Sequence, residues 1–461
     1  MAPAAILSRV KRYLCRRRVA SAGYHMEANV MSAPADLEPL AIDGGEPVRT
    51  EPLPFGPHGI HDVGDEEIAA VTKVLRRRKI FRYLERTDEE GTSEAAQLER
   101  AFCEFTGCAY AIGTTGGTTA LIAGLVGIGV NVGDEVIMPA YTYIATPSAC
   151  LTVGAIPVIA EIDGSLTIDP DDVRRKITPH TKAILPVDMI GLPCKMDEIM
   201  AIAREHDLRV LEDVAQACGG RYKGRPLGSI GNAGTFSLQH YKIITSGEGG
   251  MVVTNDQETY YRTACRHDSA MCFWDPQMAF KPFAGENFRM CDLRGALGLV
   301  QFGRMAGILD HTRRIKRRIL DQIRDLPILR PCPVNDEDGD CGISLVLTTD
   351  SVELSRRVSE ALTAEGIGNG TKHNEGFPDR HIYCYWDYVM DKHSHDASGW
   401  PWTCPQYKGN VAYSRDMCPQ TLDVLGRAIS IGITQRFTES DADDVARAIR
   451  KVAVGLSAKE A

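Results

Sequence analysis

The chain has no long apolar run: none of its 461 residues lies in an uninterrupted apolar stretch of about 18 residues, the length that spans a bilayer. It has no basic excess either, because the formal net charge is -9, which argues against general affinity for nucleic acid. We therefore expect no membrane partner and no nucleic-acid partner. The 44% of hydrophobic residues are enough for one large domain and a smaller one.

Closely paired cysteines are also missing. The 14 cysteines include no CxxC pair, and no metal site is predicted. Several of them, such as Cys103, Cys150 and Cys218, lie inside apolar runs, as buried free thiols commonly do. A reducing cytoplasm fits this pattern, and the lack of a long apolar core near the start of the chain argues against export.

The first 20 residues carry a local excess of basic side chains interleaved with apolar ones, a pattern compatible with a basic amphipathic helix. The basic residues are Arg9, Lys11, Arg12, Arg16, Arg17 and Arg18. We expect residues 1–38 to form a poorly ordered extension. An organellar transit peptide and a membrane-surface helix are the alternatives.

From about residue 65 to 310, stretches of helical period alternate with short apolar runs bounded by Gly, Pro and Asp. Strands are predicted at 110–112, 135–138, 156–159, 183–187, 209–211, 235–237 and 251–253. Helices are predicted at 118–127, 146–153, 171–176 and 196–206. This alternation indicates an α/β fold, with a mainly parallel seven-stranded sheet sandwiched between helices.

The character of the sequence changes after about residue 310. Helices are predicted at 311–324, 352–365 and 439–454, with a strand at 345–347. We therefore expect an N-terminal arm and large domain over 39–310 and a smaller α+β C-terminal domain over 311–461. Within the latter, segment 369–415 is rich in aromatics, His, Gly and Pro and has no predicted regular structure, so we expect it to shape a substrate pocket.

Lys242 has the most informative setting in the chain. It follows a strand-like run at 234–238 and precedes a glycine-rich turn at 246–250, where a lysine can hold an aldehyde cofactor as a Schiff base. Asp213 ends an earlier apolar run, at the edge where open α/β sheets bind ligands, and its carboxylate could pair with a pyridine nitrogen. Alone, Lys242 could be a surface lysine and Asp213 a helix cap; together they indicate pyridoxal phosphate chemistry.

Candidate groups for the phosphate and the ring of that cofactor are also present. The run 113–121 follows a strand and opens a helix, so its N–H groups and threonine hydroxyls can receive a phosphate at a positive helix end. Ser237 could add a hydroxyl, although a serine bonded to its own backbone is the alternative. Tyr143 could stack on the ring, with Tyr141 as the competing choice and a core position as the alternative for either. The order of these elements favours the cofactor site.

With these motifs, the chain resembles the DegT/DnrJ/StrS family of fold-type-I aminotransferases, which aminate keto sugars and related carbonyl compounds. The matching segments run in order from about residue 40 to 455. They are the phosphate turn at 115–121, the acidic motif at 212–217, the lysine segment at 236–250 and the Gly-x-Asn-x-Arg-Met motif at 285–290.

The resemblance implies pyridoxal 5'-phosphate as the cofactor and assigns roles to individual residues. Lys242 would hold the cofactor and shuttle a proton, Asp213 would pair with the pyridine nitrogen, and Gln216 would lie near the phenolic oxygen. Gly117, Thr118 and Ser237 would bind the phosphate, and Tyr143 would cover the ring face. Asn287 would reach the phosphate bound in a neighbouring subunit. The last contact implies a homodimer with shared active sites.

Two departures from the family pattern affect this reading. Thr115 and Gly116 replace the usual Asn-Ser pair, so phosphate binding should depend more on backbone donors. The C-terminal segment lacks the common Pro-Leu-His signature and carries His373-Asn374 instead. Its ending at 413–421 is similar to the branch that aminates an eight-carbon octulosonate sugar.

The activity implied by the resemblance is transfer of an amino group from glutamate or glutamine to a ketone or aldehyde of a sugar-like acceptor, in amino-sugar or natural-product biosynthesis. A pyridoxal-phosphate-dependent sugar dehydratase is an alternative, although its relatives replace the lysine with histidine. A non-catalytic regulator built on the same fold is another.

Overall fold

The computed structural model describes residues 38–56, 58–83, 93–276 and 278–460. The predicted N-terminal extension, residues 1–38, lies outside the described residues except for its last residue. Among the described residues, no helix is both long enough and apolar enough to cross a membrane. The same residues contain no group of three or more His, Cys, Asp or Glu side chains that could hold a metal ion.

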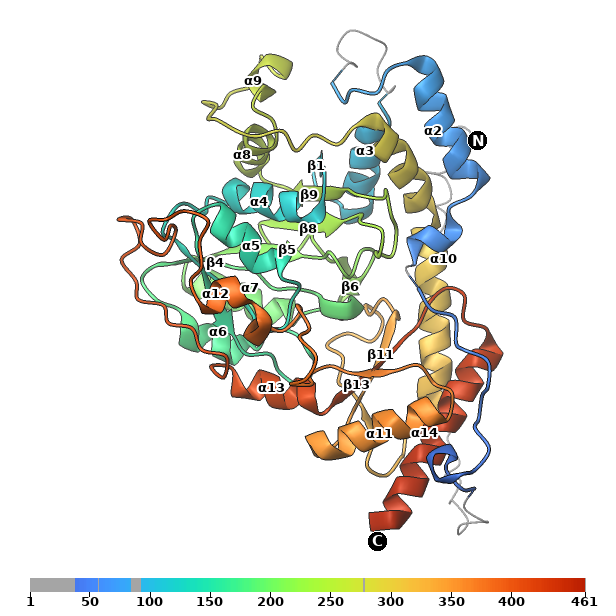
Figure 1. The fold of residues 1–461 in the computed structure, drawn as a ribbon. Coiled ribbons are helices and arrows are strands. Elements are labelled where there is room, and N and C mark those ends of the chain that lie inside the picture. Colours follow the sequence, from blue (N-terminus) through green and yellow to red (C-terminus); the bar gives the residue numbers. More distant parts are fainter. Residues whose placement is uncertain (1–37, 57, 84–92, 277, 461) are drawn as a thin grey trace.

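A seven-stranded sheet forms the centre of the larger part of the molecule (Figure 1). Its spatial order is β1 (Tyr110–Thr114), β9 (Gly250–Thr254), β8 (Ala233–Ser237), β5 (Arg209–Asp213), β4 (Thr181–Ile184), β2 (Glu135–Pro139) and β3 (Ile156–Ala160). Only β9 runs antiparallel to its neighbours within this sheet. The prediction of a mainly parallel seven-stranded sheet is confirmed.

One predicted strand ends earlier than expected. The apolar run 183–187 suggested a strand as far as Val187, but β4 ends at Ile184. Pro186 has no N–H group to donate to a neighbouring strand, which limits regular pairing there. Its carbonyl still accepts the N–H of Asp213 at 2.9 Å, and Val187 forms an isolated parallel bridge with Asp213. The chain therefore stays beside the end of β5.

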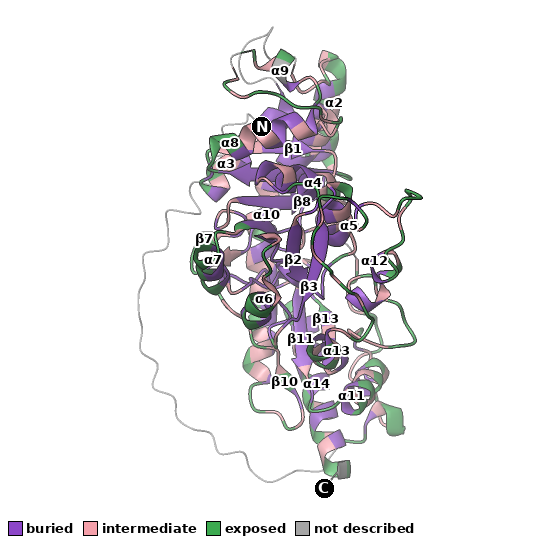
Figure 2. Cartoon of the chain, turned by 90° about the vertical axis from the view of Figure 1, so that its left-hand side faces the viewer, coloured by how far each residue is buried: buried purple, intermediate pink, exposed green. Residues whose placement is uncertain are grey.

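Helices cover both faces of the sheet. On one face lie α4 (Gly117–Gly127) and α5 (Ala145–Thr152). On the other lie α3 (Glu94–Thr106), α6 (Pro170–Lys176), α7 (Met196–Glu205) and the first half of α10 (Asp292–Gln322). Because both faces are covered, the strands are buried almost throughout, as Figure 2 shows, and this explains their nearly continuous apolar sequences.

The remaining elements of the larger part lie around these layers or in its loops. They are the 3-10 turns η2 (Gly59–Asp62) and η4 (Met189–Gly191), the helices α2 (Asp65–Arg77), α8 (Gln257–His267) and α9 (Met271–Trp274), and the short hairpin of β6 (Arg221–Tyr222) and β7 (Arg225–Pro226). The 3-10 turn η1 (Ala41–Asp43) lies instead against α11 (Val352–Ala364) of the smaller part, where Ala41 N–H donates to Glu365.

Helix α10 connects the two parts of the molecule. Leu299 and Phe302 from its first half belong to the core beneath the large sheet, whereas Ile315 and Ile319 from its second half belong to a separate core. Figure 1 shows this helix running down one side of the molecule beside α14 (Glu439–Glu460). The division of the chain at residue 310 stays a prediction, and α10 passes through that position without a break.

A small antiparallel sheet organises the second core. Its order is β10 (Arg330–Pro331), β11 (Ser344–Thr348), β13 (Ala428–Gly432) and β12 (Gly370–Thr371). It packs with α10, α11 (Val352–Ala364) and α14. Segment 369–415 is mainly irregular, with only β12, the 3-10 turn η5 (Tyr383–Tyr385) and α12 (Asp387–Met390), and it is followed by α13 (Pro419–Gly426).

Glu212 fixes the turn that leads into β8. Its side chain is fully buried, and its carboxylate accepts the N–H groups of Gly228 at 2.9 Å and of Ile230 and Gly231 at 2.6 Å each. Burial raises the pKa of this carboxyl, and the three N–H donors act in the opposite direction. The bonds hold β8 beside β5, so that Asp213 and Ser237 reach the same edge of the sheet.

We expect Glu212→Ala to lower the free energy of unfolding by about 3 kcal/mol or more, because it leaves three buried donors without an acceptor. Glu212→Gln keeps one acceptor oxygen and should cost less. Thermal unfolding followed by circular dichroism measures the ranking. The control is Glu198→Ala at an exposed position of α7, which should lie within about 0.5 kcal/mol of wild type. Equal unfolding midpoints for Glu212→Ala and Glu198→Ala would contradict this role.

Candidate active site

A cavity of about 330 Å³ contains Lys242 and is lined from both parts of the molecule. The large domain contributes Gln216 and Ile190, and the smaller one contributes residues next to β11, β12 and β13. The polar lining consists of His58, Gln216, Tyr241, Lys242, Ser344, Lys372, His381 and Ser430. Among the described residues, this lining includes two lysines and two histidines but no carboxylate.

Lys242 lies in the loop that follows β8. Its backbone N–H donates to the carbonyl of Gln239 at 2.9 Å, and its own carbonyl accepts the N–H of Gly59 at 3.1 Å. Burial lowers the pKa of the Lys242 amine, and the nearby Asp213 carboxylate partly offsets this effect. The neutral, nucleophilic amine therefore forms at a lower pH than in an exposed lysine.

Asp213 ends β5 with a side chain that is only 4% exposed. Its Oδ2 accepts the hydroxyl of Thr146 at 3.1 Å, and its Oδ1 accepts the N–H of Ala215 at 3.1 Å. Burial raises the pKa of this carboxyl, while the two hydrogen bonds and the charge of Lys242 lower it. Asp213 and Lys242 are thus near enough for their charges to interact, and the two hydrogen bonds hold the carboxylate in a fixed orientation.

Gly117 and Ser237 meet at the start of α4. A Cβ atom added to Gly117 would lie 2.7 Å from Ser237 Cβ and 2.9 Å from its Oγ, so only glycine leaves this space open. The residue before the helix, Gly116, has no side chain to cap the first-turn N–H groups. Thr118 is exposed in that first turn. The arrangement leaves N–H groups of the first turn available to an anion, and the Ser237 hydroxyl can donate to it while its Oγ accepts the N–H of Gln239 at 3.3 Å.

The two candidate ring-stacking tyrosines have different surroundings. Tyr141 is 2% exposed and belongs to the core, whereas Tyr143 is 49% exposed. The Tyr143 ring lies 5.2 Å from that of His381, which lines the Lys242 cavity. Thr142 N–H donates to the His381 carbonyl at 2.8 Å, which ties the segment that carries Tyr143 to the irregular segment 369–415.

Gln216 lies in the cavity wall and is bonded to a strained turn. Its Oε1 accepts the N–H of Ile190 at 3.0 Å. Ile190 has φ 48° and ψ 30°, a left-handed conformation that is unfavourable for a β-branched residue. Such strain persists where the surroundings impose it, commonly at functional sites.

Asn287 lies apart from these groups. It is exposed, and its backbone forms an isolated bridge with Asp268. Nearby, Arg289 Nη1 pairs with Asp268 Oδ1 at 2.5 Å, and Arg289 forms a bridge with Thr114 at the end of β1. The side chain of Asn287 is thus presented on the outside of the chain.

Several residues of the site were not found from the sequence. Thr146 orients Asp213, His381 contacts Tyr143, and His58 and Lys372 line the cavity. Burial lowers the pKa of His58 to about 4, so this ring is neutral at pH 7. Only Thr146 had a usable signal, because it opens the helix directly after the Tyr143 run.

These groups fit pyridoxal phosphate. The uncapped start of α4 and Ser237 match its phosphate, the buried Asp213 carboxylate matches a protonated ring nitrogen, and a lysine with a lowered pKa matches its aldehyde. The residues present in the structure therefore form a consistent set of contacts for this cofactor.

Comparison with known proteins agrees with this assignment. The model of the DegT/DnrJ/EryC1/StrS aminotransferase family matches residues 62–391. Spore coat polysaccharide biosynthesis protein SpsC of Bacillus subtilis is 30% identical over 410 residues, which cover 87% of this chain and 98% of that protein. GDP-perosamine synthase of Caulobacter vibrioides is 41% identical over 211 residues, which cover 45% of this chain but only 56% of that protein.

Among solved structures, DesI in the presence of its TDP-sugar product matches with a TM-score of 0.69 and 25% identity, covering 92% of this chain and all of that one. The fold and the site define a pyridoxal-phosphate-dependent aminotransferase of fold type I. The chain belongs to the DegT/DnrJ/EryC1/StrS aminotransferase family. The resemblance predicted from the sequence is confirmed, together with the cofactor that it implied.

We expect Gly117→Ala to weaken pyridoxal phosphate binding at least about tenfold, because the added methyl group would overlap Ser237. Fluorescence titration of the apo-protein with the cofactor measures the affinity. The double variant Gly117→Ala/Ser237→Gly removes the overlap and should recover part of the lost cofactor affinity. Gly307→Ala in α10 has nothing within 4 Å of the new methyl group and serves as the control. Unchanged affinity in Gly117→Ala would contradict a phosphate site there.

The lowered pKa of Lys242 predicts a pH dependence of cofactor capture. The capture rate should rise with pH as the amine loses its proton, with a midpoint below that of an exposed lysine. Asp213→Asn removes the charge that raises the Lys242 pKa and should move the midpoint to lower pH. Stopped-flow absorbance of the apo-protein mixed with pyridoxal phosphate measures the rates. A midpoint that moves to higher pH in Asp213→Asn would show that the two groups do not interact in this way.

Proposed function

We propose that this protein moves an amino group from glutamate or glutamine to a ketone or aldehyde of a sugar-like acceptor, in amino-sugar or natural-product biosynthesis. The single observation that carries the proposal is a buried Lys242 in the wall of a cavity, close enough to the buried Asp213 carboxylate for the two charges to affect each other's pKa. The names of the relatives, which include a perosamine synthase and a polysaccharide biosynthesis protein, support a sugar as the acceptor.

Each residue of the site would make a separate contact with the cofactor. Gly117, Thr118 and Ser237 bind the cofactor phosphate, with Asn287 of a neighbouring subunit as a further contact. Tyr143 covers the ring face, and Gln216 lies at the phenolic oxygen. When bound, pyridoxal phosphate supplies a carbonyl carbon that receives the amino group and a conjugated ring that withdraws electrons from it.

Proton transfer falls to Lys242 and Asp213. The Asp213 carboxylate, oriented by Thr146, favours a proton on the ring nitrogen that faces it. Lys242 Nζ would move a proton from the donor α-carbon to the C4′ atom of the cofactor and, in the second half-reaction, from C4′ to the acceptor carbon. Its lowered pKa suits this exchange, because a base that titrates closer to neutral pH is present in the unprotonated form more often.

The positive character of the cavity supports an amino-acid donor. Lys372 and His381 line it together with Lys242, and no carboxylate is part of the described lining; behind the lining, Asp379 Oδ1 lies 2.7 Å from His381 Nδ1. A dicarboxylate donor such as glutamate would therefore meet cationic and neutral groups. Segment 369–415 would shape the acceptor pocket, since it supplies both of these residues.

We further propose a homodimer with shared active sites, supported by the exposed position of Asn287. The octulosonate-like ending at 413–421 remains a proposal for the acceptor. A cytoplasmic location is supported by the cysteines, since twelve free thiols are found among the described residues.

Incubation of the loaded protein with glutamate or glutamine and a panel of keto-sugar acceptors tests the function. We expect the corresponding 2-oxo acid and an aminated sugar from wild type, and a loss of about 10³-fold or more in Lys242→Ala, which lacks the proton-transfer group. The control is Lys223→Ala, whose lysine is exposed and lies outside the cavity.

The products separate the alternatives. A sugar that loses water without gaining nitrogen would indicate a dehydratase. No turnover by wild type with any acceptor, despite a bound cofactor that reacts with no donor, would indicate a regulator. Full activity in Lys242→Ala would refute the assignment of this lysine.

A further inference from the structure

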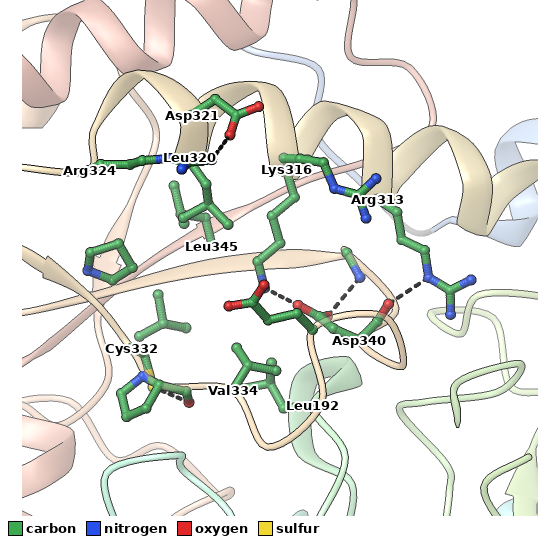
Figure 3. Close-up of a pocket in the computed structure, with 16 residues that line it drawn as sticks. Leu192, Arg313, Lys316, Leu320, Asp321, Arg324, Cys332, Val334, Asp340 and Leu345 are labelled. Carbon is green, nitrogen blue, oxygen red and sulfur yellow. Dashed lines mark hydrogen bonds and ion pairs between the residues drawn. The ribbon is translucent and has the colours of Figure 1, made fainter. Parts of the chain in front are cut away.

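A second cavity, which we name the α10 cavity, lies between the second half of α10, the loop 331–342 and β11 (Figure 3). Its volume is about 530 Å³, within the range of small-molecule sites. Apolar side chains form much of its wall, including Leu192, Leu320, Val334 and Leu345. It is separate from the cavity of Lys242, and no step of the proposed reaction uses it.

The polar floor of the α10 cavity is fixed. Lys316 Nζ forms an ion pair with Asp340 Oδ2, and both side chains are less than 10% exposed. Asp340 Oδ1 also accepts the N–H of Gly342 at 2.8 Å, and Arg313 Nε donates to the Asp340 carbonyl at 2.6 Å. Breaking a buried pair of this kind is strongly destabilising, so these groups keep their positions when a ligand enters.

The charged lining that remains consists of Arg317 and Arg324 and of two carboxylates, Asp321 and Glu337. The side chains of Arg317 and Arg324 are 64% and 67% exposed. Arg317 lies 3.7 Å from an almost fully exposed Asp338, and Arg324 pairs with Asp321 on its own helix. Exposed ion pairs contribute little, so both guanidinium groups can turn to an anion at small cost. Guanidinium groups bind carboxylate, phosphate and sulfonate oxygens through paired N–H donors.

One wall separates the α10 cavity from the cavity of Lys242. Leu192 faces the former, while Ile190, two residues earlier, lines the latter. Likewise Leu345 lines the α10 cavity and Ile343 the cavity of Lys242. The two segments are packed tightly, because a Cβ atom added to Gly191 would lie 2.8 Å from Cys341 Cβ and 2.9 Å from Ile343 Cγ1.

This wall is also connected to the residues of the candidate active site. The Gly191 carbonyl accepts the N–H of Cys341 at 3.0 Å, and the strained Ile190 donates its N–H to Gln216. A ligand in the α10 cavity would contact Leu192, which lies two residues after Ile190. The turn 189–192 is therefore the connection between this cavity and Gln216.

We propose that the α10 cavity binds a small organic anion with an apolar body, and that its occupancy is coupled through the turn 189–192 to cofactor binding at Lys242. The apolar side chains of the wall contact the apolar body of the ligand, and Arg317 and Arg324 bind its anionic group. Because linkage is reciprocal, the anion and pyridoxal phosphate should each tighten the binding of the other by the same factor. Binding to the α10 cavity does not depend on the proposed reaction.

Calorimetric titration with 8-anilinonaphthalene-1-sulfonate, an aromatic sulfonate, tests the site on the cofactor-loaded protein. We expect saturable binding that weakens at least about fivefold in Arg317→Ala/Arg324→Ala, which removes the anion contacts, and in Val334→Trp, which fills the cavity. Arg314→Ala removes an exposed charge of the same helix outside the cavity and should bind like wild type. Equal binding by all four proteins would overturn the proposal.

Comparison of the loaded and cofactor-free proteins tests the coupling. We expect the probe to bind about fivefold more tightly when pyridoxal phosphate is present, and the cofactor to bind more tightly by the same factor when the probe is present. Weaker probe binding in the loaded protein would mean that the probe occupies the cofactor site, and equal binding would mean that the sites are independent. Either result contradicts the proposal. Neither depends on finding an acceptor, so they are distinct from failure of the proposed reaction.

Discussion

A carboxylate buried at the end of β5 is the constraint on which the candidate active site depends. Burial makes the charge of Asp213 costly, and the structure offsets that cost with Thr146, the N–H of Ala215 and the charge of Lys242. Each partner comes from a different element: α5, the loop after β5 and the loop after β8. The interaction therefore fixes how these elements meet, and two of them, the loop after β5 with Gln216 and the loop after β8 with Lys242, line the cavity.

The large sheet could be predicted because its strands are buried on both faces. Each strand is a short apolar run bounded by turn residues, and all seven runs proved to be strands of one sheet. The end of β4 was predicted too late, because the apolar residues continue to Val187. Pro186 interrupts the pairing, since it has no N–H group to donate to a neighbouring strand. The 31-residue length of α10 was also missed, because its two halves face different cores and no single pattern runs through it.

The order of motifs also predicted that Asp213 and Lys242 would come together, since parallel strands end at one edge of a sheet. Segment 369–415, which holds Lys372 and His381, was expected to shape the pocket, but the individual contacts of His58, Lys372 and His381 could not be predicted. They come from irregular segments, whose positions depend on tertiary packing and leave no periodic signal. The choice between Tyr141 and Tyr143 likewise needed the structure, because two tyrosines two residues apart have the same local sequence context but opposite burial.

The central claim is that Lys242 is the residue that holds the cofactor. Reduction of the loaded protein with borohydride, followed by proteolysis and mass spectrometry, would locate the lysine that carries the pyridoxyl group. We expect modification of Lys242 in nearly all molecules and of no other lysine to a comparable extent. A pyridoxyl group found mainly on another lysine, such as Lys372 in the same cavity, would contradict it.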